Sequence, residues 1–291
     1  MSSPTGSAPG LPHRMPRPRQ SGRHRRPEPV TAPEGAPALV LAVPGHPTSD
    51  VRALADDVVS IARAELPGLD ARVGYATSGD DEFPALRDTV KQAVAERGDA
   101  AEGPAAVVVP LLVSPESQHQ QAIREAAADG GPNVLVADVL GPHPLLAEAV
   151  HVRLSEAGLA RADRARLFTV ATAADGIVLA TVGGEEAVRA AGITGMLLSA
   201  RLAVPVLAAA LDEDGAVAAT ARKLLESGSQ QLALAPYLIG PEAPEGLLAK
   251  VAEAAGCPAA EPLGSYPAVG RLALSVYMTE LGLTPERAPA R

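Results

Sequence analysis

The sequence has 291 residues, of which 47% are hydrophobic and 20% are charged, and its formal net charge is −9. A chain of this length has room for two domains with their own cores, and the composition is that of a soluble globular protein. No apolar run reaches the roughly 18–20 residues of a membrane-spanning helix. The single cysteine, Cys257, excludes an intramolecular disulfide and a cysteine-rich metal cluster.

Basic residues are concentrated at the N-terminus. Residues 1–36 contain six arginines and two glutamates, a local charge of +4, so with −9 overall the rest of the chain carries −13. The Pro- and Arg-rich composition predicts a disordered tail over 1–36, with no apolar segment that would form a secretory signal. An acidic body with no Trp and only six Phe or Tyr residues excludes a nucleic-acid-binding surface. We therefore expect a cytoplasmic protein that binds neither nucleic acid nor a membrane.

From residue 38 onward, short apolar runs alternate with helical periodicity. The continuous apolar run 38–43 predicts a strand in a sheet that is covered on both faces. A helix should follow from an N-cap at 48–50 and end at 66–68, where Leu-Pro-Gly interrupts it. Further strands are expected at 71–76, 105–113 and 133–140, and further helices at about 84–96, 116–128 and 144–157. Four successive strand–helix units predict an open parallel sheet with right-handed crossovers.

The second half of the sequence repeats the first. The phrase Val-Pro-Leu-Leu-Val-Ser-Pro-Glu at 109–116 parallels Ala-Pro-Tyr-Leu-Ile-Gly-Pro-Glu at 235–242, an offset of 126 residues. The phrase Leu140–Pro144 recurs as Leu263–Pro267 at an offset of 123 residues, and Val40–Gly45 is echoed more faintly by Val178–Gly183. Recurrence at nearly one offset indicates a tandem duplication.

The predicted fold class is therefore α/β, with two similar lobes that are each an open parallel sheet flanked by helices. We place the lobes at 37–158 and 165–282, with a polar connector near 158–164 and a short tail at 283–291. Two such lobes usually face each other across a cleft, and small ligands bind in clefts of this kind.

Two histidines follow the strands at which a ligand is expected. In a sheet of strand order 2-1-3-4, ligands collect beyond the carboxyl ends of the first and third strands, where the strand order reverses. His46 follows the first predicted strand and His119 follows the third. Imidazole suits Co²⁺ or Fe²⁺, and it also accepts protons near neutral pH. Metal binding, proton transfer and a loop position without a role all remain open for each histidine.

Several of these features resemble the sirohydrochlorin chelatase family over residues 38–281. They are the histidine after the first strand, the third strand Val-Pro-Leu-Leu-Val-Ser, the phrase Leu-Gly-Pro-His-Pro-Leu-Leu-Ala-Glu at 140–148 and the duplicated halves. The resemblance implies a chelatase that inserts Co²⁺ or Fe²⁺, as its substrate metal, into a tetrapyrrole on the way to cobalamin or sirohaem, without an organic cofactor. It implies metal ligation by His46 and His119 and proton acceptance by His46. Arg124 is a candidate to bind the carboxylates of the tetrapyrrole.

The sequence also departs from the family pattern. Both histidines stand one residue beyond the family's positions, which Gly45 and Gln118 occupy here. A second hypothesis is therefore a catalytically degenerate member that binds tetrapyrrole or metal, or scaffolds a partner, without insertion. A third is an unrelated α/β enzyme or nucleotide binder that shares only the architecture, although the chain has no phosphate-binding glycine motif.

Overall fold

A computed structural model describes residues 31–77, 79–98, 103–160 and 174–283. Most of the predicted N-terminal tail, most of the connector and nearly all of the C-terminal tail lie outside these residues. The described end of the N-terminal tail departs from the prediction. The amide of Ala32 donates to the carbonyl of Pro67 at 2.9 Å, and Ala32 packs against the hydrophobic core. The body of the protein therefore begins several residues before residue 37.

The first lobe is a parallel sheet of order β2-β1-β3-β4, as the sequence predicts. Its elements are β1 Ala38–Val43, α1 Ser49–Glu65, β2 Ala71–Tyr75, α2 Leu86–Arg97, β3 Ala106–Pro110, α3 Ser117–Ala128, β4 Val134–Val136 and α4 Pro144–Glu156. Every residue of β1 is buried, which fits its continuous apolar sequence. The strand β3 is shorter than predicted and ends at Pro110, although the amide of Leu111 still donates to the carbonyl of Ala42 at 2.9 Å.

The second lobe has a smaller parallel sheet of order β6-β5-β7. Its elements are β5 Gly176–Thr181, α5 Gly184–Leu202, β6 Val206–Ala210, α6 Ala216–Glu226, β7 Leu232–Pro236, α7 Leu247–Ala255 and α8 Pro267–Glu280. Where the first lobe has β4, the second has an isolated bridge between Leu234 and Ala259. The phrases at 109–116 and 235–242 span the ends of β3 and β7, and those at 140–144 and 263–267 lead into α4 and α8. Both pairs therefore fall on equivalent elements of the two lobes. The two-lobed α/β fold is thus confirmed.

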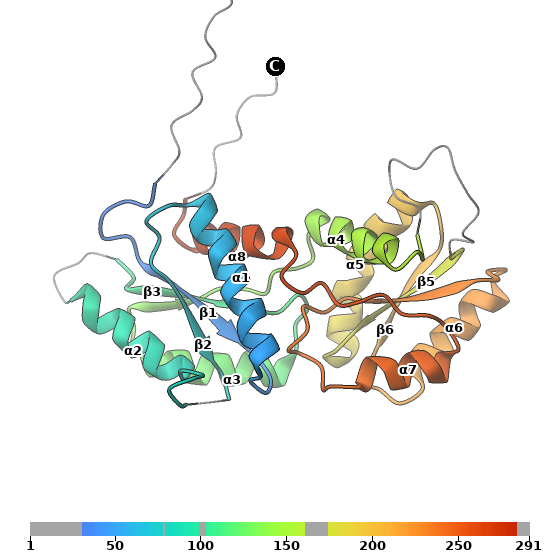
Figure 1. The fold of residues 1–291 in the computed structure, drawn as a ribbon, viewed down its shortest axis with the longest axis horizontal. Coiled ribbons are helices and arrows are strands. Elements are labelled where there is room, and N and C mark those ends of the chain that lie inside the picture. Colours follow the sequence, from blue (N-terminus) through green and yellow to red (C-terminus); the bar gives the residue numbers. More distant parts are fainter. Residues whose placement is uncertain (1–30, 78, 99–102, 161–173, 284–291) are drawn as a thin grey trace, which may run out of the picture.

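The last helix of each half crosses to the other lobe. Helix α4 packs against α5 and β7, and α8 packs against α1, β1 and β3 (Figure 1). The predicted bounds 37–158 and 165–282 assign these two helices to the wrong lobes. Helices must cover both faces of each sheet. Helices α2 and α3 cover one face of the first sheet, and α1 alone does not cover the other, so that face needs a second helix. Helix α8, from the second half of the chain, packs beside α1 on this face, and α4, from the first half, packs on the second lobe. One cluster of buried hydrophobic residues therefore runs through both lobes.

The close approach of α8 to α1 depends on Gly270. A Cβ atom at Gly270 would lie 2.6 Å from Cβ of Ile61 and 2.9 Å from the carbonyl oxygen of Val58. The two helix backbones therefore touch where the second half of the chain meets the first. No helix in the described part of the chain combines the length and the apolar character needed to cross a bilayer.

Candidate functional site

The two lobes meet through loops at the carboxyl ends of their strands. Gly45, after β1, has a φ of +73°, and a Cβ atom there would overlap the carbonyl oxygen of Pro241, after β7. Gly183, after β5, has a φ of +111°, and a Cβ atom there would lie 2.5 Å from the carbonyl oxygen of Pro115, after β3. Both prolines belong to the repeated phrase. The contacts are therefore equivalent under the duplication, and each requires a glycine.

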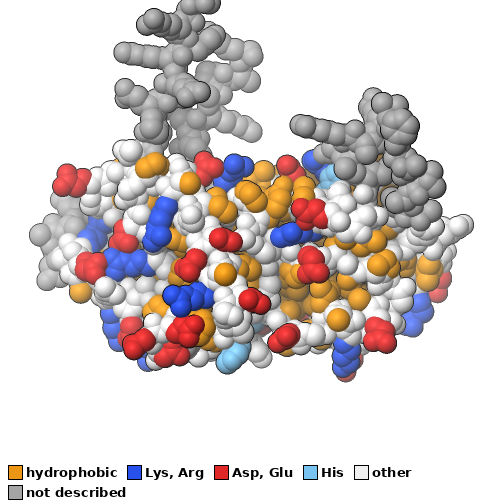
Figure 2. Space-filling model, viewed as in Figure 1, with side chains coloured by type: hydrophobic (Ala, Val, Ile, Leu, Met, Phe, Trp, Pro, Cys, Tyr) orange, Lys and Arg blue, Asp and Glu red, His pale blue; other side chains and the backbone are white. Residues whose placement is uncertain are grey.

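A cleft of about 900 Å³ lies beside these contacts, lined by loops from both lobes. His46 and His119 both line it, so the structure brings the two sequence-predicted residues to one cleft. The same lining contains five carboxylates, on Asp50, Glu116, Asp212, Glu242 and Glu245. No lysine or arginine is present among the described residues that line the cleft. Outside the cleft lining, the face of the molecule in Figure 2 shows acidic and basic side chains interspersed, without a continuous basic patch.

His46 lies on an exposed turn between β1 and α1. The carbonyl of the preceding Gly45 accepts a hydrogen bond from the hydroxyl of Thr77, in the loop that follows β2. Two residues beyond His46, the hydroxyl of Thr48 accepts from the amide of Val51 at 3.2 Å and caps α1. The loop is fixed at both ends, while the His46 side chain stays open to solvent.

His119 is the third residue of α3 and is paired with the residue that caps that helix. The carboxylate of Glu116 accepts from the amide of Gln118 at 3.1 Å and from the amide of His119 at 2.5 Å. Nδ1 of the His119 ring lies 2.9 Å from Oε2 of Glu116. This contact does not have the geometry of a hydrogen bond, and Nδ1 is shielded from solvent without a hydrogen-bond partner. The side chain of His119 is 24% exposed and that of Glu116 is 12% exposed.

The predicted metal site stays a prediction. No group of three or more His, Cys, Asp or Glu side chains within the described ranges is arranged to hold a metal ion. The two histidines with nearby carboxylates are donors that suit a divalent transition metal.

Arg124 does not belong to the site. It is exposed on α3 and does not line the cleft. Five residues separate it from His119, which turns its side chain about 140° around the helix axis. The expectation that it binds substrate carboxylates in this cleft is wrong.

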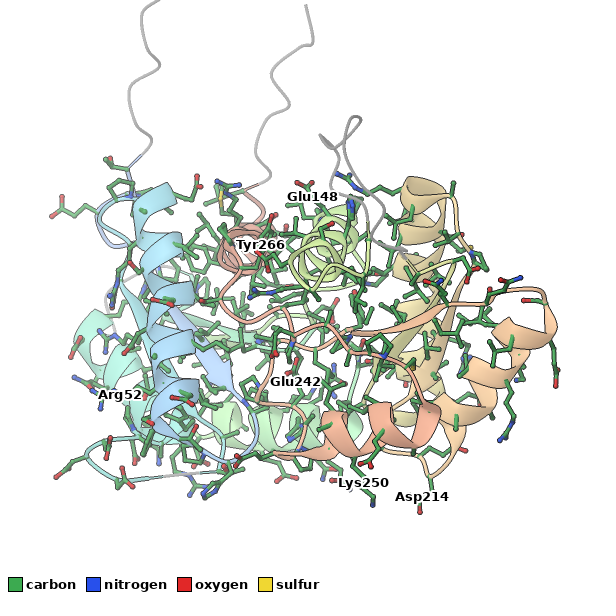
Figure 3. The ribbon with its side chains drawn as sticks, turned by 45° about the vertical axis from the view of Figure 1, so that its right-hand side comes forward. Arg52, Glu148, Asp214, Glu242, Lys250 and Tyr266 are labelled. Atoms are coloured by element: carbon green, nitrogen blue, oxygen red, sulfur yellow. The ribbon has the colours of Figure 1, made fainter. Side chains whose placement is uncertain are left out.

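Glu242 is the residue of the cleft that sequence reasoning missed. Figure 3 shows it on the loop that follows β7, in the middle of the molecule. Its carboxylate accepts from the amide of Ile239 at 2.8 Å and from the amide of Gly240 at 2.6 Å, and the residue is only 5% exposed. Burial raises the pKa of Glu242 to about 6, and the backbone hydrogen bonds partly offset this rise. The available signal was the repeated phrase, because Glu242 stands where Glu116 stands in the first half.

Asp212 connects two loops of the second lobe at the cleft. It follows β6, and its carboxylate accepts from the amide of Gly183 at 3.1 Å. This bond holds the loop that contacts Pro115.

Comparison with known proteins leaves the family open. No family model matches the chain, and no curated protein matches it. Among solved structures, the chain is similar to the ligand-free, open form of a substrate binding protein with adhesive properties from Clostridium difficile. The similarity covers 84% of each chain at 10% sequence identity, with a TM-score of 0.33. A likeness this distant carries no argument about function, and the resemblance to the chelatases stays a hypothesis.

Proposed function

We propose that this chain is a cytoplasmic, sirohydrochlorin chelatase-like protein that handles Co²⁺ or Fe²⁺ in the cleft between its lobes. The observation that carries the proposal is the placement of His46 and His119 in one cleft, at the carboxyl ends of the strands of a duplicated α/β fold. Ligands of open α/β sheets collect at this position. The cleft volume of about 900 Å³ lies within the usual range for small-molecule sites.

Metal insertion into a tetrapyrrole exchanges two pyrrole N–H protons for one divalent ion. The reaction needs a metal held by few ligands, a bound macrocycle and a base. His46 delivers the metal and accepts the two pyrrole protons in turn, because its exposed ring can pass each proton on to water before it takes the next. His119 is the second ligand. It is held on the first turn of α3, while His46 sits on a turn with a glycine beside it.

The charge of the cleft favours a second candidate function, in which the protein binds the metal without inserting it. Five carboxylates and no lysine or arginine line the cleft among the described residues. This lining attracts a divalent cation and repels a macrocycle that carries several carboxylates. The second candidate is thus a catalytically degenerate member of the family.

One assay separates the two candidates. We expect purified protein to accelerate Co²⁺ or Fe²⁺ insertion into sirohydrochlorin, followed by absorbance, and His46→Ala to abolish the acceleration. A matched control is His143→Asn. His143 does not line the cleft and caps α4 through its Nδ1, 3.1 Å from the amide of Leu145, and asparagine is also a good cap.

The possible outcomes are distinct. Insertion no faster than in buffer at any tested pH, with Co²⁺ binding that His46→Ala weakens, would leave the second candidate. Absence of both Co²⁺ and tetrapyrrole binding would contradict both candidates.

A further inference from the structure

We infer that Glu116 is a positioning residue that fixes the ring tautomer of His119, so that Nε2 is the nitrogen presented to the metal. This inference deepens the proposed function and rests on it for the metal. The geometry that carries it is the 2.9 Å separation of Oε2 of Glu116 from Nδ1 of His119, with Nδ1 shielded from solvent.

The carboxylate of Glu116 is itself held in place. Each of its oxygens accepts a hydrogen bond from a backbone amide in the first turn of α3, at 3.1 Å and 2.5 Å. The side chain is 12% exposed. The first amides of a helix have no partner within the helix, so an acceptor at the N-cap is strongly retained. Glu116 therefore cannot move away from His119 without uncapping α3.

A fixed carboxylate decides which ring nitrogen carries the proton. A lone pair on Nδ1 would face the negative charge of Oε2, whereas an N–H on Nδ1 is attracted to it. A neutral His119 ring therefore has its hydrogen on Nδ1 and its lone pair on Nε2. No described residue forms a hydrogen bond with Nε2, so that nitrogen is available. Carboxylates that orient the second nitrogen of a metal-binding histidine typically change metal affinity 10- to 100-fold.

The second lobe shows that capping alone does not account for this arrangement. Glu242 is the duplicate of Glu116, and it folds back onto the amides of Ile239 and Gly240 instead of capping a helix. Three residues beyond Glu242 stands Glu245, where the first lobe has His119. Only the first lobe thus combines the glutamate with an imidazole, and that glutamate serves both a helix end and a ring.

The test separates the cap from the ring contact. In Glu116→Ser a short hydroxyl still caps α3, because serine is a preferred N-cap, but it cannot reach the His119 ring and carries no charge. Glu116→Asp keeps the charge and the cap with a shorter reach. We expect both variants to melt close to the wild-type temperature and to bind Co²⁺ about 10-fold more weakly or worse.

The tautomer is read directly in the metal-free protein. Imidazole ¹⁵N chemical shifts, with the His119 signals identified by their loss in His119→Gln, should report hydrogen on Nδ1 in the wild type and a shift toward Nε2–H in Glu116→Ser. Hydrogen on Nε2 in the wild type would overturn the inference. Unchanged Co²⁺ affinity in both variants would also overturn it and leave Glu116 as a cap. If the wild type binds no Co²⁺, the proposed function fails, while the ¹⁵N shifts still decide the role of Glu116.

Discussion

The two lobes share one plan and differ most in the loop that follows the third strand. In the first lobe this loop leads directly into α3, and Glu116 caps the helix beside His119. In the second lobe the equivalent phrase ends in a turn, in which the carboxylate of Glu242 accepts hydrogen bonds from two amides of the same loop. Helix α7 begins only at Leu247. The first lobe therefore carries both histidines of the cleft, and the second contributes a wall with carboxylates. The two lobes thus share a backbone route, and both histidines of the cleft lining lie on the first.

The lobes also differ at their edge strands. In the first sheet Arg72 is opposite Val40, and in the second Leu207 is opposite Val178, which is the duplicate of Val40. Arg72 forms ion pairs with Asp70 and Glu96, and these raise its pKa against the cost of partial burial. Leu207 stays 39% exposed. The same position on the scaffold thus accepts a charge in one lobe and an apolar side chain in the other.

The largest effect should come from the loop contacts that make the lobes equivalent. Gly45→Ala places a methyl group against the carbonyl of Pro241 at a φ of +73°. We expect the free energy of unfolding to fall by about 3 kcal/mol or more, since overpacking adds to backbone strain. Urea denaturation measures the loss.

Gly184→Ala is the control for that substitution. Its φ is +70° and a Cβ atom there meets nothing within 4 Å, so only the backbone strain, about 1–2 kcal/mol, should remain. Equal losses in the two variants would show that the loops do not touch as described.

A smaller effect is expected where the halves exchange helices. Gly270→Ala brings a Cβ atom within 2.6 Å of Ile61 and pushes α8 away from α1. We expect a loss of about 2 kcal/mol in the free energy of unfolding. Gly192→Ala, in α5, meets nothing within 4 Å and should be neutral or stabilising by up to about 1 kcal/mol. A neutral Gly270→Ala would mean that α8 does not pack closely on α1.

The buried carboxyl of the second lobe should make stability depend on pH. Burial raises the pKa of Glu242 from its ordinary value of 4.5 to about 6, so the folded protein binds its proton more tightly than the unfolded chain does. The free energy of unfolding therefore falls as pH rises from about 4.5 to 6 and is then constant, a loss of about 2 kcal/mol.

Glu242→Gln removes this titration and keeps one of the two oxygens that accept from the amides of Ile239 and Gly240. The free energy of unfolding of the wild type minus that of the variant, from urea denaturation, should rise by about 2 kcal/mol as pH falls from about 6 to 4.5. A difference that does not vary with pH contradicts the raised pKa.

The smallest effect is predicted at the edge of the second sheet. Leu207→Arg copies the side chain of the first lobe at the equivalent position, and it should change the free energy of unfolding by no more than about 0.5 kcal/mol. Sedimentation of the variant and the wild type checks that the assembly state is unchanged. A loss of several kcal/mol would show that Leu207 is covered in solution.

The strands, the sheet order and the duplication were predictable because they depend on local patterns. The apolar run 38–43 and the phrase that ends at Glu116 specify buried strands and their loops without reference to the rest of the chain. The exchange of α4 and α8 was not predictable in this way. Periodicity shows which face of a helix is buried, but α4 would bury the same face against either sheet.

The candidate site, like the fold, could be predicted from the sequence only in part. His46 and His119 could be assigned to one edge, because parallel strands end together. The role of Glu242 depends on how a turn folds back onto its own amides, and Arg124 was misplaced because spacing alone did not account for the rotation of the helix. The acidic lining of the cleft depends on loops from both lobes, which no single segment of sequence reveals.

The exchanged helices also constrain how the protein is made. While a ribosome is still translating the second half, the first half has α1 and its sheet but lacks α8, which follows only at residues 267–280. The apolar surface that α8 will cover, including parts of α1, β1 and β3, stays open until residues 267–280 have been synthesised. Domains that fold as they emerge can close before their neighbours are synthesised, but the first lobe of this chain cannot, because its last helix comes from the second half. The first lobe of this protein is therefore completed only after most of the second lobe has been synthesised.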